Sequence, residues 1–260
     1  MYKNNSHIPV MINDIIKFIP KTKKINVIDA TFGGGGYSKH LLENHKINNL
    51  IAIDRDPITS IFANNLKKKF KNFKLINGKF SQIDFLLNCE KKNKINKYDI
   101  IIFDLGLSSN QLNNPNKGFS FMKNGPLDMN MGGSDIKLNT ILNDFSEKKI
   151  ADILFNFGNE KFAKKIAKNI VNFRKKQVLK NTNELTQLIK DSVPYIYKKK
   201  SKIDPSTKTF QALRIYVNDE LNELKVALEK ASKLLEVEGK IIVVSFQSLE
   251  DRIVKDFFNH

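Results

Sequence analysis

Four consecutive glycines, Gly33 to Gly36, follow a short apolar run that ends at Asp29 and precede a helical pattern that starts at Ser38. Glycine loses more backbone entropy on folding than any other residue. Four in a row therefore indicate a loop that needs unusual backbone angles or a close approach to a bound group. A strand, a glycine loop and a helix N-terminus form the nucleotide-binding corner of doubly wound α/β folds. The sequence predicts such a corner near its beginning.

A second apolar run at 50–53 ends at Asp54, about twenty residues beyond the glycine loop. An acid at that distance and at a strand end can accept hydrogen bonds from ribose hydroxyls. This pair predicts an adenosine-bearing cofactor. The dinucleotide fingerprint G-x-G-x-x-G requires glycine at position 38 or 39, where the chain has Ser38 and Lys39. An NAD-dependent oxidoreductase is therefore disfavoured, also because no catalytic His or Lys pair is evident. A loop of the S-adenosylmethionine type fits better.

Further strands are predicted at 73–76 and 98–104, and the second of these is apolar throughout, as expected for a central parallel strand covered on both faces. Four strand–helix units in succession predict an α/β fold. After Asp104, residues 105–133 are rich in Gly, Ser, Asn, Pro and Met and read as one long loop. A loop of that length within a compact domain is usually functional.

Only helical periodicity is visible from about 139 to 202, after which one long helix is predicted over 209–236 and a strand over 240–246. The strand returns the chain to the sheet. We therefore predict a cofactor-binding domain built from 1–114 and 209–260, with an inserted all-helical domain at 115–208.

The formal net charge is +17, from 44 basic and 27 acidic residues, which favours a polyanionic partner such as nucleic acid. Most of the basic residues are lysines. Those of the predicted insert either form a solvated face or contact RNA phosphates. They are Lys161, Lys164, Lys165, Lys168, Lys175, Lys176, Lys180, Lys198, Lys199, Lys200 and Lys202.

Cysteine content, apolar runs and the N-terminal residues indicate the cellular compartment. Cys89 is the one cysteine, so no internal disulfide can form, and no run of about eighteen apolar residues is present. The beginning has no apolar core of a signal peptide, and the four histidines lack metal-ligand spacing. We expect a cytoplasmic protein without a metal and without a membrane segment.

Several longer stretches together match one known family. They lie at 7–11 (HIPVM), 31–36 (TFGGGG), 52–57 (AIDRDP), 104–106 (DLG), 118–121 (GFSF), 125–129 (GPLDM), 209–215 (TFQALRI) and 248–252 (SLEDR). They resemble the bacterial RsmH (MraW) family of S-adenosylmethionine-dependent methyltransferases. The resemblance runs from His7 to about Phe257.

The resemblance implies a class I, Rossmann-like methyltransferase sheet interrupted by a helical substrate-recognition domain. It implies methylation of the exocyclic N4 amine of one cytidine in the decoding region of small-subunit ribosomal RNA. The partner would be that RNA or the assembled small ribosomal subunit, and monomer and dimer both stay open. The cofactor contacts that carry over are Gly35, Gly36, Tyr37, Asp54, Phe80, Asp104 and Gln111.

Asp104 is the expected catalytic group, because it and the adjoining loop could accept hydrogen bonds from the cofactor or from the amine as that amine becomes positive. His7, Phe119 and Phe121 are substrate-side candidates. Packing is an equal alternative for all three, with Phe119 and Phe121 in an apolar lid. No cysteine nucleophile is needed, since no ring carbon is attacked.

The sequence departs from the family at several positions. Tyr37 and Gln247 stand where the family has histidine, and Asn130 and Gly132 replace its arginine and aspartate. The family also continues with two further strands and a basic tail, which this sequence lacks. We expect the strand at 240–246 to be a sheet edge, masked by another element or by a partner chain, in a shortened variant or an incomplete chain. The alternative function is a truncated, non-catalytic RNA-binding relative.

Overall fold

The computed structural model describes residues 9–89 and 97–259, which divide into two compact units. Unit 1 contains the chain up to Ser108 and again from Leu221 onward, and unit 2 is the continuous segment from Ser109 to Glu220. The predicted insert at 115–208 falls wholly within unit 2, whose bounds extend further at both ends.

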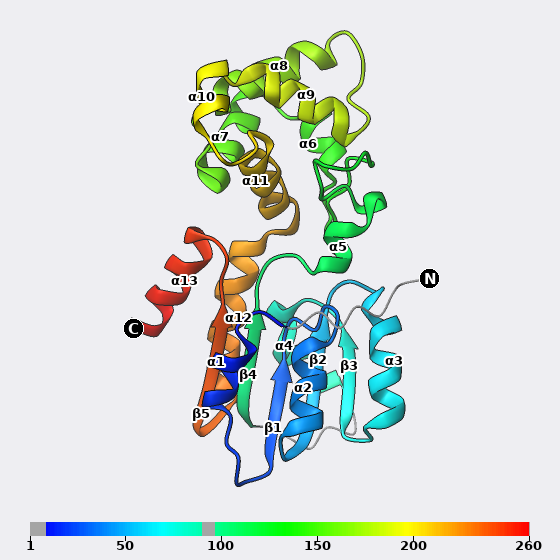
Figure 1. Cartoon of the computed structure of the whole chain (residues 1–260), viewed down its shortest axis with the longest axis vertical. Coiled ribbons are helices and arrows are strands. Elements are labelled where there is room, and N and C mark those ends of the chain that lie inside the picture. Colours follow the sequence, from blue (N-terminus) through cyan, green and yellow to red (C-terminus); the bar gives the residue numbers. More distant parts are fainter. Residues whose placement is uncertain (1–8, 90–96, 260) are drawn as a thin grey trace. The chain divides into compact units, whose positions relative to one another are not determined.

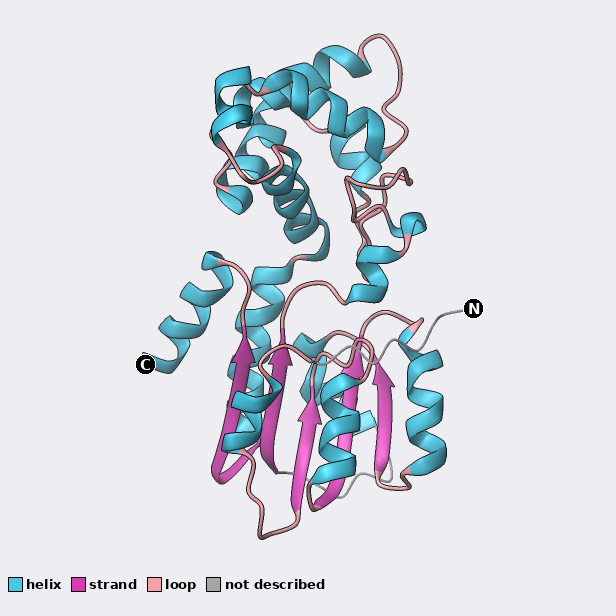
Figure 2. Ribbon diagram, in the orientation of Figure 1, coloured by secondary structure: helices cyan, strands magenta, loops and turns pink. Residues whose placement is uncertain are grey.

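Unit 1 is built on one parallel sheet of five strands in the order β3-β2-β1-β4-β5, and all arrows in Figure 2 point the same way. The strands are β1 (Ile25–Asp29), β2 (Ile47–Asp54), β3 (Phe73–Asn77), β4 (Tyr98–Asp104) and β5 (Leu235–Val244). The order reverses at β1, so β1 and β4 border the switch point at which such folds bind ligands. The predicted Rossmann-like α/β sheet is confirmed.

Helices cover both faces of this sheet (Figure 1). On one face lie α1 (Ile12–Ile15), the 3-10 turn η1 (Ile16–Phe18), α2 (Gly36–Asn44) and α3 (Thr59–Lys69). On the other lie α4 (Ile83–Cys89), α12 (Glu220–Leu234) and α13 (Ser248–Asn259). β4 is accordingly buried on both faces, with its residues Ile100 to Phe103 at most 1% exposed. This burial explains the continuous apolar run of the sequence.

Unit 2 is helical. It contains α5 (Ser109–Asn113), the 3-10 turn η3 (Pro115–Lys117), α6 (Leu138–Asp144), α7 (Glu147–Gly158), α8 (Ala163–Arg174), α9 (Thr182–Ser192), α10 (Tyr195–Lys200) and α11 (Ser206–Asn218). α11 packs along α7, and Gly158 permits their close approach, because a Cβ there would lie 2.6 Å from the Lys208 carbonyl oxygen. The ring of Tyr216 lies 6.1 Å from that of Phe145 and 5.8 Å from that of Phe157.

Two predictions about the regular elements are wrong. The single helix predicted over 209–236 is two helices, α11 and α12, because Asp219 takes a left-handed conformation with φ of 51° and ends α11. The long loop predicted over 105–133 contains α5 and η3, and the Asn114 side chain caps η3 by accepting the Asn116 N–H.

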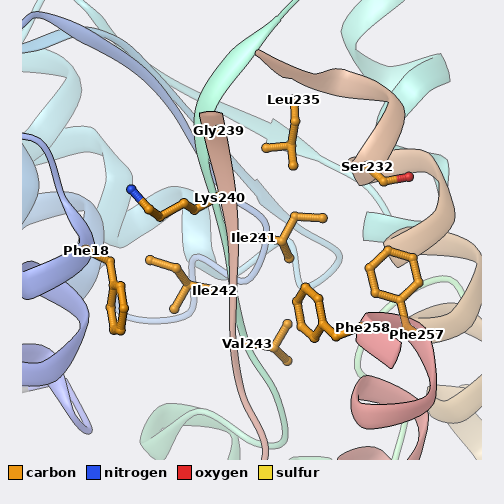
Figure 3. Close-up of a pocket in the computed structure, with 10 residues that line it drawn as sticks. All are labelled: Phe18, Ser232, Leu235, Gly239, Lys240, Ile241, Ile242, Val243, Phe257 and Phe258. Carbon is orange, nitrogen blue, oxygen red and sulfur yellow. The ribbon is translucent and has the colours of Figure 1, made fainter. Parts of the chain in front are cut away.

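β5 forms one edge of the sheet, as predicted, and within the described residues it pairs with β4 alone. An apolar groove of about 630 Å³ runs along it (Figure 3). In that view Phe18 and Ile242 lie on one side of the strand and Ile241, Val243 and Phe258 on the other.

Across the described ranges, 9–89 and 97–259, no helix combines the length and apolar character needed to cross a membrane. The same ranges hold no group of three His, Cys, Asp or Glu side chains that could hold a metal ion.

Candidate active site

The glycine loop joins the carboxyl end of β1 to the start of α2 and is fixed by backbone contacts to both neighbouring strands. Ala30 N–H donates to the Ile102 carbonyl of β4 at 2.8 Å, and Phe32 N–H donates to the Ile53 carbonyl of β2 at 3.0 Å. Gly33 has φ of 53° and Gly35 has φ of 79°, angles that other residues rarely adopt. The loop therefore lies at the switch point of the sheet.

Two of the glycines are required by close packing. A Cβ at Gly35 would lie 2.7 Å from the Phe32 ring, and a Cβ at Gly36 would lie 2.6 Å from Cγ of Pro9. Gly36 is the first residue of α2, so the loop delivers the chain directly into a helix N-terminus. The first N–H groups of a helix have no partner inside it and favour polar or anionic groups of a ligand.

Asp54 is the last residue of β2, and its carboxylate bonds both to the glycine loop and to the chain that follows β2. Its Oδ2 accepts the Gly33 N–H at 2.7 Å, and its Oδ1 accepts the Asp56 N–H at 2.8 Å. Burial, partly offset by these two bonds, raises the pKa of the carboxyl to about 6. A carboxylate has about four lone-pair sites, so Asp54 can hold the loop and still accept ribose hydroxyls.

Asp104 ends β4, and its N–H donates to Oγ1 of Thr31 at 2.7 Å. Its side-chain oxygen Oδ1 is buried and has no hydrogen-bond partner within the part of the chain that the structure describes. Burial, together with the charges of Asp29 and Glu250, raises the pKa of Asp104 to about 7. A buried acceptor without a donor costs free energy, so a ligand donor at this oxygen would be favourable.

The carboxylates at this edge influence one another. Asp29 is fully buried, accepts the Ser38 hydroxyl at 2.6 Å, and has a pKa raised by burial. The neighbouring charges that act on Asp54 and Asp104 are all carboxylates: Asp29 on both, with Asp56 on the first and Glu250 on the second. This edge of the sheet therefore carries a negative potential that suits a positively charged ligand group.

Phe246 extends the site beyond β5. Phe246 is 56% exposed, and a Cβ built on Gly106 would lie 3.6 Å from its ring, so the ring borders the loop that follows Asp104. Glu250, which is 3% exposed at the start of α13, accepts the Phe246 N–H at 3.1 Å. Glu250 thus holds the Phe246 backbone beside the loop of the catalytic candidate.

Two predicted cofactor residues occupy packed positions in unit 1. Tyr37, in the first turn of α2, has a buried ring whose hydroxyl donates to the Val10 carbonyl, so the side chain anchors the N-terminal segment. Burial raises the pKa of that hydroxyl. Phe80 opens the 3-10 turn η2 (Phe80–Gln82) after β3, and its partly buried ring meets that of Phe103 edge to face at 5.8 Å.

The structure thus brings Gly35, Gly36, Tyr37, Asp54, Phe80 and Asp104 to the carboxyl edge of the sheet in unit 1. Gln111, Phe119 and Phe121 belong to unit 2, so their roles stay predictions. Gln111 is buried in α5, Phe119 is only 5% exposed, and Phe121 packs on Phe210 at 5.5 Å. His7 lies outside the described residues.

Three residues of this site were not among the predicted site residues: Asp29, Phe246 and Glu250. In the sequence Asp29 stands out only as the polar end of an apolar run, and Glu250 only as part of the Ser-Leu-Glu-Asp-Arg stretch of the family resemblance. An acid that closes an apolar run and an acid two residues into a helix are the signals that could have identified Asp29 and Glu250.

Comparison with known proteins identifies the family of the chain. The family model described as the MraW methylase family matches residues 4–260. The chain belongs to the MraW methylase family. Three curated relatives are each named ribosomal RNA small subunit methyltransferase H.

These relatives are similar over most of their length. The protein from Rickettsia bellii (strain RML369-C) is 43% identical over 253 residues, which cover 97% of this chain and 80% of the relative. That from Wolbachia sp. subsp. Drosophila simulans (strain wRi) is 45% identical over 255 residues, covering 97% and 85%. That from Anaplasma phagocytophilum (strain HZ) is 44% identical over 260 residues, covering 98% and 86%.

Proposed function

We propose that this MraW-family chain is an S-adenosylmethionine-dependent ribosomal RNA methyltransferase that methylates the N4 amine of a cytidine in the decoding region of small-subunit ribosomal RNA. The observation that carries the proposal is the buried Oδ1 of Asp104 beside the glycine loop, which has no hydrogen-bond partner among residues 9–89 and 97–259. The names of the relatives support ribosomal RNA of the small subunit as the substrate class.

The residues of the site fit the proposed cofactor. S-adenosylmethionine supplies an electrophilic methyl group when it is bound. Asp54 would hold the ribose hydroxyls, Phe80 would pack against the adenine, and the Gly35–Gly36 backbone at the start of α2 would hold the polar end. The carboxylates of Asp29 and Asp104 would favour a cationic ligand, because the charges that reach this edge are negative. Gln111 is proposed as a further cofactor contact from unit 2.

On the substrate side, Asp104 would orient the amine. The lone pair of a cytosine amine is delocalised into the ring, so the nitrogen is a weak nucleophile and its orientation matters. A free Oδ1 can accept one amine hydrogen and thereby fix the nitrogen. The same carboxylate can then take the proton that the amine loses, because a carboxyl whose pKa is about 7 exchanges protons readily near neutral pH.

Orientation of this kind is a large part of the expected catalysis. Holding two reacting atoms in line can supply on the order of 7–11 kcal/mol of a barrier. Phe246, exposed beside Gly106, could stack on the flipped base while Asp104 holds its amine. His7, Phe119 and Phe121 are additional substrate-side candidates.

The proposal is tested by methyl transfer from labelled S-adenosylmethionine to small ribosomal subunits that lack the modification, with naked small-subunit RNA assayed in parallel. Nuclease digestion should release N4-methylcytidine, and the better of the two substrates distinguishes free RNA from the assembled subunit. Asp104→Asn, with the same size and no charge, serves as the inactive control. Cofactor binding without transfer to either substrate would refute the proposal and favour a non-catalytic RNA-binding relative.

A further inference from the structure

The helix α10, with the residues that follow it to Ile203, presents large apolar side chains to solvent. Tyr195 is 76% exposed, Ile196 65%, Tyr197 52% and Ile203 58%, and no residue of α10 is buried. Single exposed apolar side chains are ordinary, but four within nine residues concentrate exposed apolar surface on one short segment, here called the apolar patch, and such concentrations mark interaction sites.

α10 is nevertheless held in a defined place on unit 2. The ring of Tyr197 meets the ring of Phe162 edge to face, with centroids 5.0 Å apart, which brings α10 beside the start of α8. On the C-terminal side, Ser201 Oγ accepts the Ile203 N–H at 3.1 Å, and Asp204 pairs with Lys190 at 3.6 Å. The apolar patch therefore belongs to a folded surface of this unit.

Positive charge surrounds this patch. Lysines stand at 198, 199, 200 and 202 around α10 and at 161, 164, 165 and 168 at the start of α8. Neither 161–168 nor 195–203 contains an acidic residue. Seven of these lysines are exposed and Lys198 is half-buried, and Lys164 and Lys168 lie one helical turn apart on α8. The resulting surface combines aromatic rings with a concentration of lysine cations.

We propose that α10 and the start of α8 form a binding surface for single-stranded RNA, with Tyr195 as a base-stacking platform and the surrounding lysines as phosphate contacts. Aromatic rings stack on any unpaired base, and lysines bind phosphates regardless of sequence. A duplex would not fit this surface as well, because its bases are already stacked on one another. The proposal rests on the proposed function in taking RNA as substrate, and it adds a surface for nucleotides other than the methylated one.

The test measures binding of the full chain to a fluorescently labelled, unstructured single-stranded RNA by anisotropy at several salt concentrations. Tyr195→Ala should weaken binding about 5- to 150-fold, the range that loss of one stacked base gives, while Tyr195→Phe should bind as the unaltered chain does. Phe155→Ala is the matched control, since Phe155 is another exposed aromatic residue of unit 2, 60% exposed, and lies in α7. Its affinity should not change.

The lysines are tested by the salt dependence. Lys199→Gln with Lys200→Gln should lower the slope of log Kd against log salt by about 1.4, because each phosphate contact on a single strand contributes about 0.7. The control pair Lys67→Gln with Lys68→Gln removes the same charge from exposed positions of α3 and should leave the slope unchanged.

Three results would overturn the proposal. The first is unaltered RNA affinity of Tyr195→Ala, or an equal loss in the control variants. The second is binding to phosphatidylserine vesicles that Tyr195→Ala abolishes while RNA affinity stays the same. The third is dissociation of a dimer by Tyr195→Ala, seen by light scattering, again with RNA affinity retained.

Methyl transfer assayed in parallel separates this proposal from the proposed function. A chain that methylates its substrate yet binds RNA independently of Tyr195 refutes only the surface. A chain that binds RNA through Tyr195 but transfers no methyl group refutes only the proposed function.

Discussion

The substitution Asp104→Asn is expected to stabilise the protein while removing its activity. Asn has the size of Asp but no charge. In the folded protein Asp104 is half-buried, its Oδ1 has no donor among the described residues, and Asp29 and Glu250 add like charge. The ionised carboxylate is therefore disfavoured by the fold, and the amide avoids that cost.

The magnitude and its sign follow from the raised pKa of Asp104. Folding raises this pKa from the ordinary 3.8 to about 7, so between these values the unfolded chain ionises at Asp104 while the folded chain stays protonated. Stability is consequently lost as pH rises through this window, and the loss is complete above pH 7. Three pKa units correspond to about 4 kcal/mol, and we expect about 1–3 kcal/mol because water reaches part of the group.

The assay is urea unfolding of both proteins at pH 5 and pH 8, followed by circular dichroism. The stability advantage of Asp104→Asn should grow by about 1–2 kcal/mol between the two pH values. Asp135→Asn, which neutralises an exposed acid of unit 2, should show no such growth. In parallel, methyl transfer by Asp104→Asn should fall by about 10²- to 10⁴-fold, the usual contribution of a general base.

Two outcomes would contradict this reasoning. A stability difference that is equal at pH 5 and pH 8 would show that Asp104 is not held against ionisation by the fold. Retention of methyl transfer by the amide would show that no proton or charge on this side chain is needed.

Three further substitutions probe the fold and the site. In steady-state assays Phe246→Leu should raise KM for the RNA substrate about 5-fold or more with unchanged affinity for S-adenosylmethionine, since stacking contributes about 1–3 kcal/mol. Phe246→Trp keeps an aromatic ring and should have the KM of the unaltered chain. Gly35→Ala should cost about 1–3 kcal/mol in thermal unfolding and weaken cofactor binding measured by calorimetry, because its Cβ would meet Phe32 at 2.7 Å at a φ of 79°. Asn218→Ala should cost about 2–3 kcal/mol in urea unfolding, since the buried Asn218 amide bonds the Met129 carbonyl at 2.8 Å; unchanged stability would contradict its structural role.

The sheet of unit 1 was predictable because its residues carry local signals. The strand at 98–104 is apolar over its whole length, and Asp29, Asp54 and Asp104 each close an apolar run. Parallel strands end at the same edge, so the sequence order of these acids was enough to bring them together.

The break between α11 and α12 was not predictable from hydrophobic spacing, which continues through it. Asp219 ends α11 in a left-handed conformation, a role usually taken by glycine and sometimes by Asn or Asp. The reason for the break lies in tertiary contacts: the side chain of Asn218 accepts the Met131 N–H at 2.9 Å and donates to the Met129 carbonyl. Both partners are more than eighty residues away in the sequence, and periodicity does not report such contacts.

The charge environment of Asp104 could not be predicted from the neighbouring sequence either. That Asp104 should lie near a ligand followed from its strand end, but its charge environment depends on Glu250, which comes from α13. The contact of Phe246 with Gly106 is also one between distant parts of the sequence. It arises because β5 pairs with β4, although the whole insert separates these two strands in the sequence.

That pairing has a consequence for the order in which the chain can fold. α12 supplies Leu224, Ala227, Leu228 and Ala231 to the core on one face of the sheet, and β5 follows directly after it. During synthesis β1 to β4 therefore emerge with one face covered by α4 but not yet by α12, and they stay so while the whole of unit 2 is made. Unit 2 is one continuous segment, so it can complete its own core in that interval. If it stayed unfolded, it would be a long flexible loop between β4 and α12, and the entropic cost of closing such a loop rises by about 0.6 kcal/mol with each doubling of its length. A ribosome that stalls within unit 2 would hold a chain whose half-covered sheet is exposed to aggregation until synthesis resumes.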